Sequence, residues 1–422
     1  MADTLIDFLP RLAAAASVLL MGGCGAGLLW RLNRVIRGRE HALRARYAPG
    51  SADTRELLAV VLLAFASRLA IYAAAWGMHR LLGGGYGLIA SVKPLFMHWD
   101  TRHYVGIAEQ GYTAVGDERL WLVFFPLYPW LMRLVSPLTG GDAFFAGIII
   151  SLACGSVSAG LLYELAHSVY GRRTARLAAA YFLLSPLSVF LCCAYTEALF
   201  ICLTLAAVVL FRRGRPWLAA VFGMLSAFTR MPGVIVAGLF IIGAIDRFGR
   251  KALRAKDACC CAAQVLIVFC GLFAYWAVNW AVTGDPMMYL TYQKENWFQQ
   301  PGSFWGTAEN TAYYFLATVG DDDWLFTWGF QLLCMFYVFA LLCFGQRKLP
   351  FDLAAYSFVY TAVVLAPTWL LSGPRYLYAL VPLPLLQARM HKRPGMHVLA
   401  LSLSGALLAV WIFGYAIAVE VL

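Results

Sequence analysis

The chain has 422 residues, of which 62% are hydrophobic and only 13% are charged, and its formal net charge is +11 at pH 7. A soluble globular domain carries about 25% charged residues, so this composition excludes an ordinary soluble protein. Apolar runs of roughly twenty residues recur along the whole chain, and each is long enough to cross a bilayer as a helix. Because backbone groups in lipid must be hydrogen-bonded within their own segment, we expect an all-α polytopic membrane protein.

The hydropathy pattern predicts about twelve membrane helices, with both chain termini on the outer side. They lie near 9–30, 57–79, 143–168, 177–194, 197–211, 216–229, 232–246, 258–282, 325–344, 352–371, 376–389 and 397–419. The first run has acidic rather than basic residues before it, which favours a helix over a signal peptide. Segments 216–229 and 376–389 are shorter than the usual minimum of about 17 residues. Each is predicted either to enter the membrane partway or to join a re-entrant hairpin.

The positive charge is concentrated in short clusters between the apolar runs. These clusters are 31–55, 172–176, 212–215, 247–256, 347–348 and 389–393. Cytoplasmic loops of membrane proteins collect Lys and Arg, so the clusters mark the inner face. The net positive charge is therefore interpreted as marking the cytoplasmic loops, and no nucleic-acid partner is predicted.

If these clusters face the cytoplasm, the two long connections at about 80–142 and 283–324 lie on the external side of the membrane. Loops of this length are usually functional. Both are rich in aromatic residues, which suits amphipathic helices lying at the membrane interface. Neither loop contains a soluble domain, so the sequence predicts a single transmembrane domain over 1–422.

The most informative local sequence is Trp99-Asp100-Thr101-Arg102-His103-Tyr104, in the first external loop. In a helix over 95–110, Asp100 and His103 lie three residues apart on one face. A carboxylate at the membrane surface can accept the proton of an attacking hydroxyl as a general base. The alternative is structural: Asp100 caps the helix or pairs with Arg102, and Trp99 anchors at the interface.

Three further sites fall on the same predicted outer side. Tyr195-Thr196-Glu197 begins the helix at 197–211, with Thr196 as a possible N-cap and Glu197 as an acid at membrane depth, where ionisable groups are costly and commonly functional. Arg230 and Arg375 lie at outer helix ends, where a guanidinium can hold a phosphate through two donors or extend to the interface. Phe124-Phe125-Pro126 and Pro129 form a rigid aromatic element for which a structural role is favoured.

No cofactor is firmly predicted. The run Asp321-Asp322-Asp323 could attract a divalent cation, but consecutive side chains diverge, and a solvated cap before the next helix is the favoured interpretation. The sequence also lacks a P-loop, a glycine-rich dinucleotide turn and a His-Glu-x-x-His zinc motif. A donor carried on a membrane lipid is therefore easier to accommodate than a cytoplasmic nucleotide.

Taken together, these motifs resemble the PIG-V mannosyltransferase family, which includes the transferase that adds the second mannose of GPI anchors and related prokaryotic proteins. The matching blocks, in order, are Trp99-Asp100 through Tyr104, Ile107-Ala108-Glu109, Gly111-Tyr112, Phe124-Phe125-Pro126, Ser185-Pro186 with Phe190, Tyr195-Thr196-Glu197 with Leu199-Phe200, Arg230, and Arg375-Tyr376. The chain departs from the family at Arg230-Met231-Pro232-Gly233, where Arg-Ser-Asn-Gly is frequent, and by an additional helix at 9–30.

The resemblance implies a GT-C fold and inverting transfer from a polyprenyl- or dolichyl-phosphate-mannose donor to a glycolipid or glycan acceptor, with Asp100 as the catalytic base. The donor's phosphate and sugar are expected to contact His103, Arg102, Arg230, Arg375 and Tyr376. The expected lining of the site is Trp99, Tyr104, Glu197, Tyr195, Phe125 and Pro126. No metal ligand is predicted.

Two other functions remain open: a lipid-linked-sugar transporter or flippase, and an inactive relative that serves as an assembly partner. Transporters place ionisable or broken-helix sites near the midplane of the membrane, whereas the notable groups here lie at the outer edge. The excess of arginine over lysine favours a prokaryotic plasma membrane over the ER membrane, with the active site extracytoplasmic.

Overall fold

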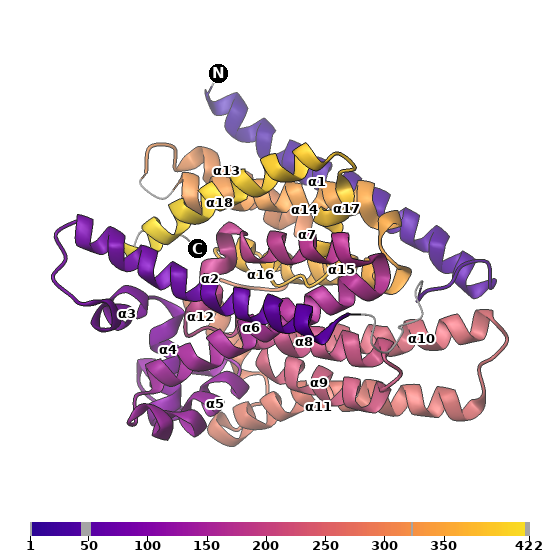
Figure 1. Ribbon diagram of the computed structural model, residues 1–422, viewed down its shortest axis with the longest axis horizontal. Helices are drawn as coiled ribbons and strands as arrows, with labels where there is room; N and C mark the ends of the chain where they lie inside the picture. The colour runs from indigo at the N-terminus through magenta and orange to yellow at the C-terminus, as the bar shows by residue number, and fades with distance from the viewer. Residues whose placement is uncertain (1, 44–51, 322–323, 418–422) are drawn as a thin grey trace.

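The computed structural model describes residues 2–43, 52–321 and 324–417, and every regular element within them is helical (Figure 1). The long helices are α1 (Ala2–Ile36), α2 (Thr54–Leu81), α6 (Ala143–Tyr170), α8 (Glu197–Arg212), α11 (Ala255–Thr283), α14 (Phe330–Gly345) and α18 (Pro394–Ala416). Helices of intermediate length are α4 (Asp100–Gln110), α7 (Arg172–Leu183), α9 (Pro216–Thr229), α10 (Ala237–Gly249), α12 (Met288–Trp297), α13 (Phe304–Ala317) and α15 (Phe351–Val364). The short ones are α3 (Leu88–Phe96), α5 (Leu127–Val135), α16 (Gly373–Tyr378) and α17 (Leu383–Met390).

Five short 3₁₀ segments and one π segment, η5, lie between these helices in the described residues: η1 (Asp117–Val123), η2 (Ser136–Thr139), η3 (Pro186–Cys192), η4 (Met231–Val236), η5 (Leu325–Gly329) and η6 (Gln346–Lys348). Within the described residues, 7 helices are long and apolar enough to cross a membrane, or up to 9 if each bent pair counts as one span. The predicted all-α multi-pass architecture is confirmed, but the predicted number of twelve spans is not.

Two of the missing spans are interrupted by proline. The predicted span at 177–194 breaks into α7 and η3, which are bent by 74°. Pro186 has no N–H to continue a helix, and it holds Ser185 in an extended conformation (ψ 137°). The segment predicted at 376–389 is likewise divided between α16 and α17, with Pro382 at the N-cap of α17. The helix predicted at 352–371 ends at Val364.

Helix α6 runs from one end of the helical bundle to the other, so its first and last residues are used to name the two ends. Its 28 residues span about 42 Å at 1.5 Å per residue. At the start, Asp142 caps the helix by accepting from the backbone N–H groups of Phe144 and Phe145, and it also pairs with Lys93 of α3 at 2.6 Å. Helices α3, α4 and α5 gather at this end, on the left of Figure 1. We call it the loop end, and we call the opposite end, where Tyr170 finishes α6, the basic end.

The predicted inner-face clusters meet at the basic end. Arg31 donates to the backbone carbonyls of Gln346 and Leu349 at 2.8 and 3.1 Å, which joins the first cluster to the fifth. The Tyr170 hydroxyl donates to the Lys348 carbonyl at 2.7 Å, and the Arg389 guanidinium lies over the Tyr170 ring. The part of the first cluster at 44–51 lies outside the described residues. Arg212 of the third cluster pairs with Asp352 at 2.6 Å, and the Ala42 N–H donates to Asp246, beside the fourth cluster, at 2.8 Å. The second cluster begins α7 directly after Tyr170. The described basic clusters thus share one end of the bundle, as a common membrane face requires.

The two long connections predicted to share one face also meet, at the loop end. The Tyr275 hydroxyl, near the end of α11, donates to the Leu122 carbonyl in η1 at 2.7 Å. Phe124 packs edge-on against Trp297 of α12, with ring centroids 5.9 Å apart. The first loop is therefore held in place by the second.

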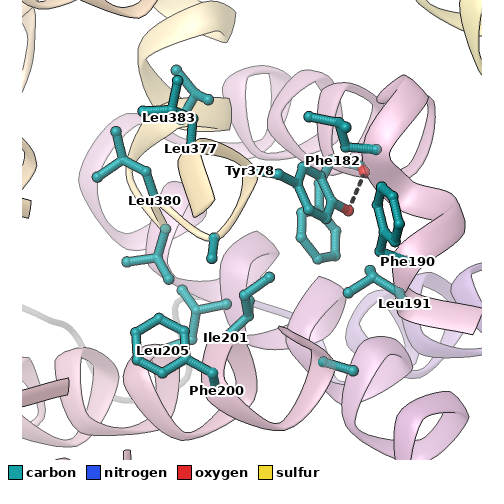
Figure 2. Close-up of a cluster of buried hydrophobic side chains, with 14 of the residues drawn as sticks. Phe182, Phe190, Leu191, Phe200, Ile201, Leu205, Leu377, Tyr378, Leu380 and Leu383 are labelled. Carbon is teal, nitrogen blue, oxygen red and sulfur yellow. Dashed lines mark hydrogen bonds between the residues drawn. The ribbon is translucent and has the colours of Figure 1, made fainter. Parts of the chain in front are cut away.

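A buried apolar cluster fixes the elements that carry the charged groups discussed below. Figure 2 shows side chains of α7, η3, α8, α16 and α17 packed together, including Phe182, Phe190, Phe200 and Leu377. The Tyr378 hydroxyl donates to the Phe182 carbonyl at 3.0 Å. This contact ties α16 to α7 and so sets the position of α16 relative to the start of α8.

Candidate active site

Four charged side chains from four distant parts of the sequence meet in one cluster. Arg375 on α16 donates through Nη2 to Glu197 Oε1 at 2.8 Å and to Asp100 Oδ2 at 3.0 Å. Its Nε also donates to Glu197 Oε1, at 3.1 Å. Arg230, the C-cap of α9, donates to the same Glu197 oxygen at 2.7 Å. The sequence predicted all four residues, and the structure brings them together; we call them the four-residue cluster.

Glu197 lies at the centre of this cluster. It opens α8 and its side chain is fully buried, so it needs compensating positive charge to remain ionised. Within Glu197, Oε1 accepts every hydrogen bond that the two guanidiniums donate to this residue, whereas Oε2 is buried and has no hydrogen-bond partner among the described residues. A buried acceptor without a partner is uncommon in native proteins and indicates a place for a water molecule or a ligand donor.

Aromatic rings hold the two guanidiniums from the sides. The Arg375 guanidinium lies 4.4 Å from the Tyr195 ring centroid and 5.1 Å from that of Phe190. Arg230 lies 4.6 Å from the ring of Tyr376. Desolvated cation–π contacts of this kind favour the charged guanidinium and fix its plane. Tyr195, predicted to line the site, and Tyr376, predicted to contact the donor, thus lie against the arginines of the cluster.

Asp100 is the most exposed member of the cluster. Its side chain is 29% exposed, compared with 3% for Arg375. The preceding residue, Trp99, has φ 44° and ψ −122°, an unfavourable conformation for a residue with a large side chain. Such strain persists only where the surroundings enforce it and is concentrated at functional sites. Here the Trp99 ring packs edge-on against Tyr415 of α18, at 5.0 Å, and α4 starts at Asp100 in a direction that presents its carboxylate to Arg375.

His103 and Tyr104 follow on α4. The His103 ring stacks on Phe124, with centroids 5.0 Å apart, and burial lowers its pKa, as does the nearby Arg102, while Asp100 raises it in part. His103 is therefore neutral near pH 7 and retains one N–H donor. The Tyr104 hydroxyl lies 3.5 Å from the Thr196 hydroxyl, which links α4 to the residue before Glu197.

Other expectations are not met. Arg102 is exposed and donates to the Met97 carbonyl at 3.1 Å, so the alternative in which it pairs with Asp100 is wrong, and it does not join the cluster. Thr196 occupies the N-cap position of α8 but makes no side-chain cap hydrogen bond, so the capping interpretation is also wrong. Phe125 stacks on Tyr275 at 3.9 Å in a separate aromatic group, and Pro126 is buried before α5.

The possible cation site in the second loop includes residues that the structure does not describe, so it stays an expectation. Within the described part of the chain, no group of three or more His, Cys, Asp or Glu side chains is placed to hold a metal ion. Asp322 and Asp323 lie outside the described residues. Asp321 is not the N-cap of the helix that follows, because that position belongs to Trp324.

Sequence reasoning missed two aromatic contributors, Phe124 and Tyr415. Phe124 contacts both His103 and Tyr104, although its neighbour Phe125 had been predicted to line the site. Tyr415, near the end of the last helix, contacts His98, Trp99 and Phe190. Nothing in its apolar surroundings distinguishes it from lipid-facing residues.

Comparison with known proteins bears on this cluster. Residues 90–294 match the family described as mannosyltransferase (PIG-V). The GPI alpha-1,6-mannosyltransferase 2 of Cricetulus griseus is 33% identical over 153 residues, which are 34% of this chain and 30% of that protein. The Homo sapiens protein of the same name is 30% identical over 182 residues, 40% of this chain and 36% of that protein. The matches thus span about a third of the length of these relatives.

Among solved structures, ArnT from Cupriavidus metallidurans bound to undecaprenyl phosphate superposes with a TM-score of 0.50 and 14% sequence identity, over 84% of this chain and 64% of that one. At this sequence identity the superposition shows a shared fold and does not show a shared activity. The fold is that of GT-C membrane proteins, as predicted. The matched segment 90–294 carries Asp100, Glu197 and Arg230, so the chain resembles the PIG-V mannosyltransferases in the region that supplies three of the four charged residues of the cluster.

Proposed function

We propose that this protein is an inverting glycosyltransferase, and specifically a mannosyltransferase, that uses a polyprenyl- or dolichyl-phosphate-linked sugar as donor. The observation that carries the proposal is the Arg375 bridge, in which one guanidinium contacts both Glu197 and the partly exposed Asp100. A candidate base and a candidate phosphate-binding cation are thereby fixed within one hydrogen bond of each other. The family match supports the sugar, and the lipid-phosphate donor is an inference from the resemblance and from the fold.

In this proposal Asp100 accepts the proton of the acceptor hydroxyl while that oxygen attacks the anomeric carbon of the donor sugar. The new bond forms on the face opposite the phosphate, and the bond between the anomeric carbon and the phosphate oxygen breaks. The lipid phosphate leaves with the bonding electron pair, which inverts the configuration at that carbon. The proton remains on Asp100 until solvent removes it.

Arg375 and Arg230 would stabilise the leaving phosphate. Both are fixed in advance by Glu197, so little reorganisation is needed as negative charge develops. Neutral His103, on the same helix as Asp100, can donate one further hydrogen bond. The proposed acceptor is a glycolipid or glycan. The proposed side of the membrane is extracytoplasmic, because the basic clusters lie at the opposite end of α6. The excess of arginine over lysine favours a prokaryotic plasma membrane.

The test uses purified protein, a panel of radiolabelled polyprenyl-phosphate sugars and a membrane-lipid extract as acceptor. We expect transfer from the mannose donor, and we expect Asp100→Asn to lower the rate by about 10²–10⁴-fold, the usual contribution of a general base. Glu109→Gln is the matched control, because Glu109 is an exposed acid on the same helix. It should retain wild-type turnover.

Wild-type turnover by the Asp100→Asn variant would remove Asp100 from the mechanism. An inactive relative would show no transfer with any donor, and a lipid-linked-sugar transporter is distinguished from the transferase in sealed vesicles. Movement of the labelled lipid across the membrane, with no sugar transferred to any acceptor in the extract, would overturn the proposal in favour of transport.

A further inference from the structure

A cavity of about 530 Å³ lies at the basic end, between α7 and α18. Arg172, Arg173 and Arg176 from the first turns of α7 form one wall, and Val398 and Leu401 of α18 belong to the other. We call it the α7–α18 cavity. It begins just beyond Tyr170, whereas Asp142, at the other end of α6, adjoins the loop end that carries Asp100. The cavity is therefore separate from the candidate active site, and its volume is in the range of small-molecule sites.

The arginine wall has an excess of positive charge. Glu56 of α2 is the carboxylate that faces it, and this residue pairs with Arg172 and Arg176 and accepts a hydrogen bond from Tyr163. Two of the three guanidiniums thus share the one carboxylate, and the charge of Arg173 is not neutralised by it. The first turn of α7 contains no acidic residue, so its backbone N–H groups add to the positive potential rather than being neutralised. All three arginines are exposed, and no ion pair of Arg173 is found among the described residues.

The other groups around the cavity add no negative charge. His397 belongs to the lining, but its ring is already engaged: Nδ1 lies 2.9 Å from the Tyr181 hydroxyl and Nε2 lies 3.1 Å from the His391 carbonyl. Lys392 and Arg393, both exposed, precede α18 in the sequence. An anion is the ligand that this arrangement favours, held by forked guanidinium donors.

The opposite wall continues along a membrane-facing helix. Val398 is 64% exposed, and α18 is a candidate span of which only 22% is buried in the molecule. A ligand in the α7–α18 cavity would therefore have its anionic part against α7 and would continue along the apolar surface of α18. Basic pockets between membrane helices on the inner side commonly bind anionic lipid headgroups.

We propose that the α7–α18 cavity binds the headgroup of an anionic phospholipid of the surrounding membrane, with the acyl chains lying along α18. A free phosphate ion would satisfy the arginines but would leave the apolar wall uncovered. A zwitterionic phospholipid would bring its own cation against three guanidiniums. The phosphate together with the acyl chains accounts for both walls.

The test is native mass spectrometry of the whole protein released from nanodiscs that contain equal amounts of phosphatidylglycerol and phosphatidylcholine. We expect one retained phosphatidylglycerol molecule per protein. Arg173→Gln should lower its occupancy about fivefold, the equilibrium effect of one arginine near an anionic membrane. Val398→Trp should lower it by a similar factor, because the indole fills the cavity without any change of charge.

Two variants are matched controls. Arg215→Gln removes an exposed arginine from another cluster at the same end, and Leu399→Trp adds an indole at the adjacent, 65% exposed position outside the cavity lining. Both should retain the lipid. An equal loss in Arg215→Gln and Arg173→Gln would reduce the effect to general attraction and overturn the proposal. So would equal retention of phosphatidylcholine, failure to retain any lipid, or displacement of the lipid by inorganic phosphate alone.

Discussion

The two ends of the bundle each contain a buried arginine–carboxylate contact, and the two contacts differ in how many of their carboxylate oxygens accept a hydrogen bond. At the basic end, Arg212 donates to both oxygens of Asp352, each at 2.6 Å, and the two side chains are 3% and 0% exposed. At the loop end, Arg375 is shared between two carboxylates, Asp100 remains partly open to solvent, and Glu197 Oε2 has no partner among the described residues.

This difference indicates that Arg212–Asp352 stabilises the fold, whereas the four-residue cluster can contact a ligand. A closed pair, in which both carboxylate oxygens accept from one guanidinium, holds α8 against α15 and leaves no oxygen to accept from a ligand. The four-residue cluster retains an accessible carboxylate and an unfilled acceptor. Arg212 Nε is also buried without a hydrogen-bond partner among the described residues, so an unsatisfied atom alone does not distinguish the two contacts. The combination of an unfilled carboxylate acceptor with a partly exposed acid suggests a function beyond stability.

The largest effect that would sharpen this comparison is expected for Arg375→Gln. Sugar transfer should fall by about 10²–10³-fold, because the leaving phosphate loses a pre-positioned charged donor. Arg230 still neutralises Glu197, so the protein should fold. Arg375→Lys restores the charge without the forked donors and should give an intermediate rate. Initial rates of radiolabel transfer measure both, and an Arg375→Gln rate close to wild type would contradict the proposed role.

Asp352→Asn tests the opposite end. It leaves Arg212 buried without its counter-charge and should destabilise the fold by about 3 kcal/mol. The rate of transfer per folded molecule should not change, since Asp352 lies at the basic end. The midpoint of unfolding in detergent gives the first quantity, and rates normalised to the folded fraction give the second. A loss of rate without loss of stability would show that the two ends are not functionally separate.

A smaller effect is expected for Glu197→Gln, because the amide oxygen can still accept from both arginines. Transfer should fall about tenfold, mainly in kcat, as the guanidiniums lose the anchor that fixes them for the transition state. Glu197→Asp keeps the charge but shortens the reach, and it should recover part of kcat. If Glu197 were only structural, the unfolding midpoint would fall in the Gln variant while kcat per folded molecule stayed constant.

The smallest effect concerns His103. Burial is the main cause that lowers its pKa below the usual 6.5, so the folded state resists protonation that the unfolded state accepts. Stability should therefore be full above pH 6.5 and should decline as the pH falls from 6.5 towards the depressed folded-state pKa. His103→Gln should reduce this decline. Unfolding midpoints at pH 7.5 and 5.5 measure it, and equal declines in both proteins would assign the effect to other groups.

Much of the site was predictable because its residues stand in short, unusual motifs. Asp100, Glu197, Arg230 and Arg375 are polar residues in or beside strongly apolar segments, where each is conspicuous. Their partners were not predictable. Asp100 has Arg102 two positions away, yet it pairs with Arg375, 275 residues distant. Once α4 forms, Arg102 points to the surface, and only the packing of α16 beside α8 brings the distant arginine close.

By itself, the sequence determined the membrane class, the helical content, the shared end of the basic clusters and the identity of the four-residue cluster. These properties depend on hydropathy and charge over a few tens of residues, which local composition reports directly. The tertiary structure alone decided which helices break at proline, how Trp99 directs α4, how Glu197 holds two arginines, and that α7 and α18 enclose a basic cavity. Each of these depends on contacts between segments far apart in the chain, and such contacts exist only after the helices have packed.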